Sequence, residues 1–196
     1  MSALPKKFYS PEEYLALERV AECKSDLCDG EIIPRAVCNS SHNLIVSNII
    51  GAMRAQIKKL PCTAFTSDMR FKVAKTDSYF YADFVVVCGK LQLEDEDNLL
   101  NPTLLVEVFS QNTAGYDRGE KFRHYRQIPS FREFLLIAQD RCYIEHYVKR
   151  KDGRWEFSVI DELQSVIGLP SIECELAVAE IYDKVEFKRG AEFERV

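Results

Sequence analysis

Two carboxylates stand alone in apolar stretches of this chain. Asp83 lies within the run 79–87, and Glu107 lies within the run 104–109. Both runs are rich in β-branched and aromatic residues and have the length of central strands. Because ionised acids are rarely buried unless they are paired or bind a metal, each carboxylate predicts an ion pair or a shared cation. Two such acids, on strands joined by a connection short enough to make them neighbours, favour the shared cation.

The chemistry of this pair is that of a hard metal centre. Carboxylate oxygens are hard ligands, so Asp83 and Glu107 predict Mg²⁺ or Mn²⁺, and the backbone carbonyl of Val108 offers one more oxygen ligand. Such a cation polarises a phosphoryl oxygen and lowers the pKa of bound water, which together support phosphodiester hydrolysis. Glycoside hydrolysis also uses two carboxylates, but the chain lacks the size and the aromatic subsites usual for sugars.

A basic side chain should accompany the acids. Lys121 is the candidate, since it falls in the first turns of the helix predicted between the Glu107 strand and the next strand. The alternative is a surface lysine paired with Asp117 at i,i+4 spacing.

Other polar residues are weaker candidates. Glu31 could hold a water or a second metal, or be an exposed hairpin acid. His42 could approach the scissile phosphate, or only cap or pack a helix. Arg70, Lys72 and Arg118 could form a phosphate-binding rim, with solvated surface charge as the default. The two remaining histidines are interpreted as structural or surface residues.

Composition narrows the class of protein. The chain has 196 residues, 46% of them hydrophobic, which is enough for one domain with a sizeable core. The net charge of -5 argues against a protein that coats nucleic acid through bulk charge. Seven scattered cysteines without a C-x-x-C pair predict reduced core or surface thiols and disfavour a zinc site. No membrane-helix or signal-peptide pattern appears, so we expect a cytoplasmic protein.

The remaining patterns give an order of elements around one central sheet. We expect a helix from Pro11 with a Ser10–Glu13 capping box, then a hairpin around Asp29-Gly30. A longer helix, 40–59, precedes three strands, of which the first covers 62–73 and the other two carry the acids. A helix over 117–127 follows, capped by Asp117 and Glu120 or beginning as early as Thr113, and then a strand over 131–138. A hairpin, 142–148 with 155–160, and a helix, 177–185, end the predicted fold.

Several motifs together resemble the Uma-two family, a widespread bacterial family also called domain of unknown function 820. They are YADFVVV at 81–87, NPTLLVEVFS at 101–110 and YDRGEKFRHYR at 116–126, and the resemblance covers about 8–185. It implies a restriction-endonuclease-like αβββαβ core of the PD-(D/E)xK nuclease superfamily. On that resemblance Asp83 and Glu107 match the motif acids. Ala82 stands where a proline is usual, Phe109 stands where the lysine is expected, and Lys121 matches a lysine that has moved to the helix.

These observations lead to one principal hypothesis and one rival. The first is an α/β protein, a Mg²⁺- or Mn²⁺-dependent endonuclease with DNA as substrate, with a homodimer as a candidate assembly. We expect one domain over 1–196, with its core at about 40–140 and a disordered tail at 187–196. The rival is a catalytically silent module that binds nucleic acid or protein and keeps the nuclease fold.

Overall fold

The computed structural model describes residues 7–187. Most of the tail predicted to be disordered, 188–196, lies outside the described residues, and so do residues 1–6. No helix within the described range is long and apolar enough to cross a bilayer. That residues 1–196 form one domain stays a prediction.

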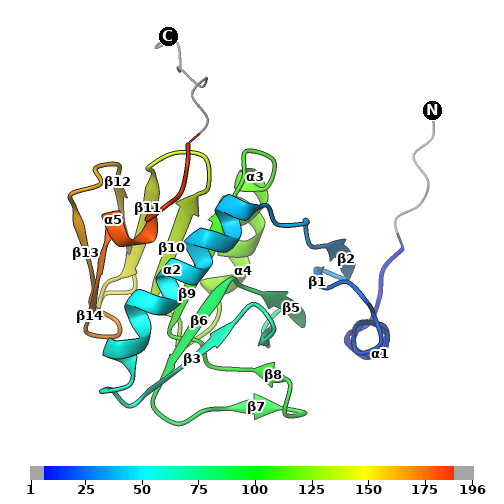
Figure 1. The fold of residues 1–196 in the computed structure, drawn as a ribbon. Coiled ribbons are helices and arrows are strands. Elements are labelled where there is room, and N and C mark those ends of the chain that lie inside the picture. Colours follow the sequence, from blue (N-terminus) through cyan, green and yellow to red (C-terminus); the bar gives the residue numbers. More distant parts are fainter. Residues whose placement is uncertain (1–6, 188–196) are drawn as a thin grey trace.

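The molecule has two six-stranded sheets, and the larger sheet, which has the longer strands, forms its centre (Figure 1). Strands β9 and β10 run parallel at its middle, and its other neighbours pair antiparallel. Residues of β9 and β10 are buried on both faces, which explains their continuous apolar sequence. In spatial order the strands are β12 (Trp155–Ile160), β11 (Ile144–Lys149), β10 (Glu133–Ala138), β9 (Leu104–Phe109), β6 (Phe84–Cys88) and β3 (Cys62–Thr66).

A second sheet lies beside the first, so the prediction of one central sheet is wrong. Its strands, in spatial order, are β2 (Glu31–Pro34), β1 (Ser25–Cys28), β5 (Ser78–Tyr81), β4 (Arg70–Val73), β8 (Asn98–Leu99) and β7 (Leu93–Glu94). The two predicted strands 62–73 and 79–87 are each divided between the sheets. The chain leaves one sheet and enters the other at a turn near Ser67 and at Ala82-Asp83. Apolar content therefore marked burial correctly but did not show the change of sheet.

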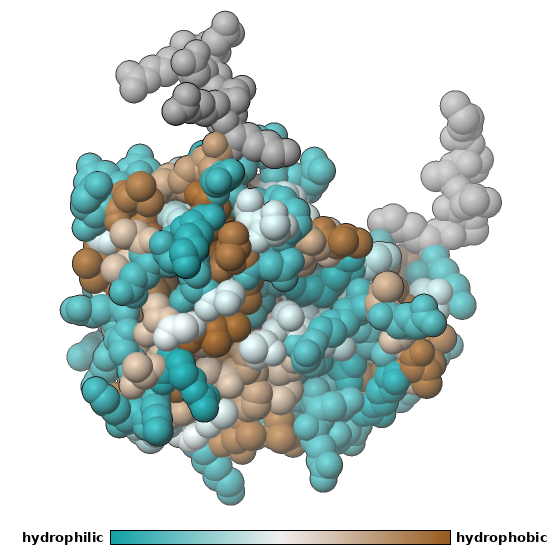
Figure 2. Space-filling view, in the orientation of Figure 1, coloured by the Kyte–Doolittle hydropathy of each residue, from teal (hydrophilic) through white to brown (hydrophobic). Residues whose placement is uncertain are grey.

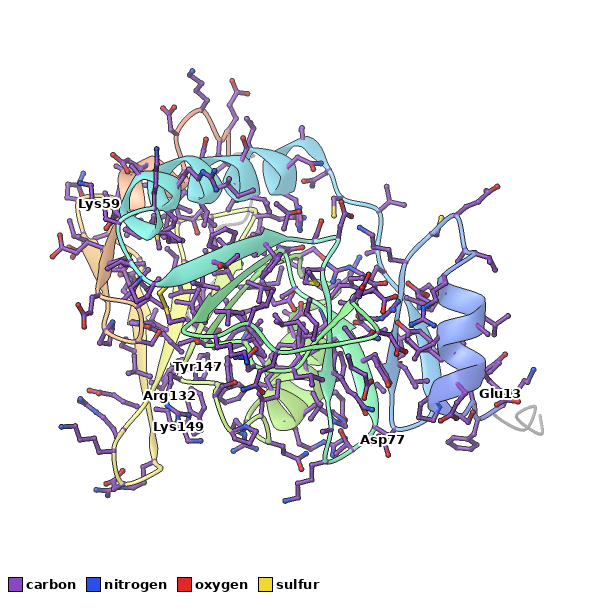
Figure 3. All side chains as sticks on the ribbon, turned by 90° about the horizontal axis from the view of Figure 1, so that it is seen from below. Glu13, Lys59, Asp77, Arg132, Tyr147 and Lys149 are labelled. Carbon is purple, nitrogen blue, oxygen red and sulfur yellow. A yellow bond between two sulfur atoms is a disulfide. The ribbon has the colours of Figure 1, made fainter. Side chains whose placement is uncertain are left out.

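Helices cover the larger sheet. Helix α2 (Ser40–Ile57) crosses one face and buries Ile45, Ile49, Met53 and Ile57, which recur every four residues and form its core face. The small hairpin β13 (Val166–Leu169) and β14 (Cys174–Ala177) and helix α5 (Val178–Ile181) share this apolar cluster. Hydrophilic residues dominate this side of the molecule, and hydrophobic ones form small separate groups (Figure 2). On the opposite side of the sheet, Arg132, Tyr147 and Lys149 lie close together (Figure 3).

The helix after β9 has the earlier of its two predicted starts, directly after Thr113. Instead of beginning at a capped Asp117, it begins with α3 (Ala114–Tyr116), continues as a π-helical turn, η1 (Asp117–Lys121), and ends as α4 (Phe122–Tyr125). Asp117 and Lys121 are buried inside it. The predicted capping box is absent because Asp117 already lies within the helix rather than before it.

The N-terminal elements follow the predicted pattern. Helix α1 (Pro11–Glu18) begins at Ser10, and the Ser10 and Glu13 side chains each bond the other's backbone N–H. Strands β1 and β2 pair around Asp29-Gly30, where both residues have positive φ, as a tight hairpin turn requires.

A disulfide joins Cys62 to Cys88. The prediction of reduced thiols is therefore wrong for this pair. The antiparallel register of β3 and β6 places the two residues directly opposite one another, although they are far apart in sequence. Among the described residues, the free cysteines are Cys23, Cys28, Cys38, Cys142 and Cys174.

Candidate active site

A pocket of about 280 Å³ opens where the two sheets meet. Its walls come from β1, the segment after β2, the start of α2, β9 and the α3–η1 helix. The residues with ionisable or strongly polar side chains that line it are Asp26, Arg35, Cys38, Asn39, His42, Asp83, Glu107, Asn112, Tyr116, Asp117, Lys121 and Gln139. A second hollow of about 330 Å³ shares Arg35, Cys38, His42 and Asp83 with the first. Asp83 therefore borders two connected depressions.

Asp83 lies at the crossing between β5 and β6 and is 2% exposed. Its Oδ2 accepts a hydrogen bond from the Val108 N–H at 2.7 Å and another from His42 Nε2 at 3.1 Å. Its Oδ1 accepts one from Arg35 at 2.9 Å. Burial alone would raise the pKa of Asp83, but the His42 bond, the Arg35 charge and the Val108 N–H outweigh burial and lower the pKa. Asp83 is therefore a carboxylate.

Glu107 occupies the middle of β9 and is 3% exposed. Lys121 Nζ lies 3.0 Å from its Oε1, and the Tyr125 hydroxyl donates to the same oxygen at 2.8 Å. Burial raises the pKa of Glu107 to about 8, against the attraction of Lys121, and the nearby charge of Asp83 adds to the rise. The two candidate acids thus have opposite pKa shifts in one pocket.

Lys121 is buried among acids rather than exposed. Its Nζ lies 3.0 Å from Glu107, 3.5 Å from Asp117 and 3.7 Å from Asp26. Burial would lower the pKa of Lys121, but the attraction of Glu107 and then of Asp26 outweighs burial, and the pKa rises. The surface-lysine alternative is therefore wrong, although the Asp117 pair that it proposed is present.

Of the two accessory candidates, His42 lines the pocket and Glu31 does not. His42 lies in the first turn of α2, where its backbone N–H bonds the Asn39 side chain, and its ring reaches Asp83. Because Nε2 donates to a carboxylate, the neutral ring carries its proton there, and the buried Nδ1 has no hydrogen-bond partner among the described residues. Glu31, in β2, does not line the pocket.

Two of the three residues proposed to bind phosphate lie outside the pocket, where their charged side chains form ion pairs within the protein. Arg70 is 4% exposed and bonds Asn98 at 2.6 Å and Asp97 at 2.7 Å. Lys72 bonds Glu94 at 3.1 Å. These acids belong to the chain around β7 and β8, which packs beside β4, so those two side chains join strands of the second sheet. Neither residue lines the pocket, so phosphate binding by them stays a prediction without support from this geometry.

Arg118 also lies away from the pocket. It bonds Glu145 at 2.6 Å and covers the Phe109 ring at 4.7 Å. It does not line the pocket either, so its role at the rim stays a prediction without support from this geometry.

Two charged pocket residues escaped sequence analysis. Asp26 accepts the Tyr81 N–H at 3.1 Å, and Arg35 bonds Asp83. Asp117 was predicted only as a helix cap and as the partner of a surface lysine. A polar residue in the short apolar strand 25–28 was a usable signal for Asp26. Arg35 had none, because only the packing of the N-terminal hairpin beside β5 brings it to the site.

The fold and the pocket define a class of protein, a mixed α/β protein of the restriction-endonuclease-like type. A solved structure shares this fold, that of a putative nuclease belonging to DUF820 from Anabaena variabilis. It has a TM-score of 0.72 and 18% identity, covering 88% of this chain and 97% of the other.

The family follows from the sequence. The family described as Uma2, "Putative restriction endonuclease", matches residues 11–179, and this chain belongs to it. Two uncharacterized proteins of Synechocystis sp. are also similar. One, sll1609, is 38% identical over 76% of this chain and 85% of its own length. The other, slr1290, is 30% identical over 91% of this chain and 93% of its own.

Proposed function

We propose that this protein is a metal-dependent endonuclease that hydrolyses phosphodiester bonds of DNA. Asp83 and Glu107 would bind Mg²⁺ or Mn²⁺, with the Val108 carbonyl as a further ligand. The observation that carries the proposal is that both buried carboxylates line one pocket with the buried Lys121. Membership of a family described as restriction endonucleases supports it. A DNA substrate also implies a cytoplasmic location.

The donor set of the pocket fits a hard cation. Four carboxylates line it, those of Asp26, Asp83, Glu107 and Asp117, against two permanent cations, Arg35 and Lys121. Among the described residues, both hydrogen bonds to the Glu107 carboxylate fall on Oε1, so Oε2 is the oxygen left for a ligand. A bound metal would supply Lewis-acid polarisation of a phosphoryl oxygen and acidify a water.

The side chains would then have distinct roles. Lys121 would fix the Glu107 carboxylate and give positive charge to the phosphate oxygens as they gain negative charge. Arg35 borders both hollows, which makes its guanidinium the candidate to hold a phosphate oxygen of an extended strand. Burial raises the pKa of Asp117, which makes it a candidate to hold a proton beside the reacting group.

A second candidate function is the silent module that binds nucleic acid or protein. The observation in its favour is that both acids have basic partners within the protein: Asp83 has Arg35 and His42, and Glu107 has Lys121. A fully paired network can persist without a metal, because breaking it would leave buried charges unpaired.

Calorimetric titration of the full chain with Mg²⁺ and Mn²⁺, followed by a cleavage screen, separates the two functions. Single-stranded, duplex and branched DNA would each be incubated with Mn²⁺. The nuclease proposal expects metal binding at one pocket and cleavage of at least one of these substrates. Absence of both metal binding and cleavage would establish the silent module instead.

A further inference from the structure

A second group of metal-binding side chains lies outside the pocket. Cys28, Asp29, Glu120 and His124 bring one ligand atom each within 4.8 Å of one another. None of them lines the pocket. They come from two segments, the end of β1 with its hairpin turn and the η1–α4 helix, where Glu120 and His124 are four residues apart. The cluster therefore joins two parts of the fold that are distant in sequence.

Two distances around His124 match tetrahedral coordination. Cys28 Sγ lies 3.4 Å from His124 Nε2, and the same nitrogen lies 3.4 Å from Asp29 Oδ1. Bonds to zinc of roughly 2.3 Å from sulfur and 2.0–2.2 Å from nitrogen or oxygen, at tetrahedral angles, separate neighbouring ligand atoms by about 3.4–3.5 Å. Cys28 and His124 are buried, at 6% and 0% exposure, so these two ligands are held in place by packing.

The orientation of His124 suits a ligand. Its Nδ1 lies 2.9 Å from the hydroxyl of Thr76, in the turn that Asp77 marks in Figure 3. That hydroxyl is 3.5 Å from the Val73 carbonyl, to which it donates, so it accepts the proton of Nδ1. The Nε2 lone pair then faces Cys28 and Asp29. A hydrogen bond from the distal ring nitrogen is the usual second contact of a metal-binding histidine.

Arg123 supplies a positive charge at the centre of the cluster. Its Nη2 lies 2.5 Å from Asp29 Oδ2, 2.7 Å from Glu120 Oε2 and 2.9 Å from His124 Nε2. One terminal guanidinium nitrogen carries two protons, so it cannot donate fully to three acceptors. The Arg123 side chain is 43% exposed and has open solvent into which it can turn. Arg123 Nε also donates to Glu120 Oε2, at 3.2 Å, so the two protons of Nη2 can serve Asp29 and His124, and the guanidinium stands where a cation would contact all three.

We propose that Cys28, Asp29, Glu120 and His124 form a structural metal site for a borderline-soft divalent cation of the Zn²⁺ class. When no metal is bound, the Arg123 guanidinium occupies this site. A thiolate and an imidazole select Zn²⁺ over the harder Mg²⁺. Four protein ligands leave no open position, as in structural sites. The metal ties the β1–β2 hairpin to η1, and these two elements carry Asp26, Asp117 and Lys121 into the pocket.

Titration of the full chain with Co²⁺, in millimolar Mg²⁺ to occupy hard sites, tests this proposal. The expected result is one bound Co²⁺ with a thiolate-to-metal absorption band and the visible bands of tetrahedral coordination. Cys28→Ser should lose the thiolate band, and Cys23→Ser, which changes an exposed thiol elsewhere, should keep it. Cys38 lies 3.6 Å from His42 beside the pocket, so loss of the band in Cys38→Ser instead would overturn the assignment.

Exposed residues give a second test that does not depend on core substitutions. Arg123→Gln removes the competing charge and should tighten Zn²⁺ binding by about tenfold or more, on the scale of contacts around a metal. In that background, Glu120→Gln should weaken binding by a similar factor, since a carboxylate ligand is lost. Unchanged Zn²⁺ affinity in both variants, or wild-type protein that binds neither Zn²⁺ nor Co²⁺, would contradict the proposal, whatever the outcome of the cleavage screen.

Discussion

Asp83, Glu107 and Lys121 are each less than 5% exposed, and neighbours rather than water set their ionisation. Asp83 has hydrogen-bond donors and a guanidinium, which keep it charged. Glu107 is equally buried, has no guanidinium partner and shares one lysine with two other acids. The pocket therefore holds one carboxylate that is ionised at all ordinary pH values and one that gains or loses a proton near neutrality.

Asp83→Asn should abolish divalent-metal binding and cleavage while the protein stays folded. The amide oxygen can still accept the Val108 N–H, but Arg35 loses its charged partner inside the protein. We expect a loss of about 1–3 kcal/mol in unfolding free energy. Calorimetry with Mn²⁺ and chemical denaturation check both parts. Metal affinity equal to that of the wild type would remove Asp83 from the ligand set.

The stability of the metal-free protein should fall as pH rises from about 4.5 to about 8. The pKa of Glu107 is raised to about 8 from an ordinary value of 4.5, so the folded state holds a proton that the unfolded state has lost in this window. The stabilisation that this proton gives is complete below pH 4.5 and is lost above about pH 8. The lowered pKa of Asp83 acts only at more acidic pH.

Denaturant unfolding of the wild type and Glu107→Gln, measured across this pH range, tests that slope. The variant should lose the part of the pH dependence that Glu107 causes. It should keep any part that Asp117 causes, because burial also raises the pKa of Asp117. Identical slopes for the two proteins would show that Glu107 titrates at its ordinary pH.

Lys121→Ala should make folding depend on metal. The change leaves Glu107, Asp117 and Asp26 buried without their shared cation, which costs about 3–5 kcal/mol in metal-free protein. Mn²⁺ should restore part of the lost thermal stability, whereas cleavage stays at least about a hundredfold slower. Lys72→Ala is the matched control, since Lys72 pairs with Glu94 outside the pocket. If Lys121→Ala cleaves like the wild type, Arg35 becomes the next candidate cation.

At the scale of elements, two connections hold the pocket walls together. The α3–η1–α4 helix passes through a π-helical turn that buries both Asp117 and Lys121, and such turns often accompany functional sites. On the other side, β6 follows Asp83 directly and is joined to β3 by the Cys62–Cys88 disulfide. The position of Asp83 thus depends on a covalent link as well as on strand pairing.

Reduction of the disulfide should lower the unfolding free energy by about 3 kcal/mol, because the bond closes a loop of 26 residues in the unfolded chain. Thermal unfolding with and without a thiol reductant measures the effect. The double variant Cys62→Ala/Cys88→Ala should show a similar loss and no further response to reductant. A response of equal size in that variant would place the effect on another cysteine.

At the scale of the whole molecule, the net charge of -5 opposes DNA binding through bulk attraction. The pocket itself is lined by more acids than bases, so a bound metal would have to bridge the protein and the phosphate. Binding to DNA should therefore depend on the metal rather than on a basic surface.

Fluorescence anisotropy with a duplex that resists cleavage, such as a phosphorothioate, tests this dependence. At about 0.15 M salt we expect no binding in EDTA and binding once Mn²⁺ is added. The salt dependence should be shallow, corresponding to roughly two or three phosphate contacts. Tight binding in EDTA with a steep salt dependence would instead reveal a basic surface away from the pocket.

The sequence alone determined the elements whose signals are local. Solitary acids in apolar runs identified Asp83 and Glu107 as buried, the helical pattern in 40–59 predicted α2, and Asp29-Gly30 predicted its hairpin. Position along the chain suggested Lys121. The family motifs supported that choice and added the restriction-endonuclease-like fold, which the structural likeness confirms.

Only the tertiary structure decided which polar groups meet. Asp26 and Arg35 enter the pocket because a second sheet packs beside the first, and the apolar runs that continue through Ala82-Asp83 give no sign of that division. Cys62 faces Cys88, and Cys28 approaches His124, through strand register and helix packing. Such contacts join residues that are far apart along the chain, and local periodicity carries no information about them, because it reports burial and not the partner.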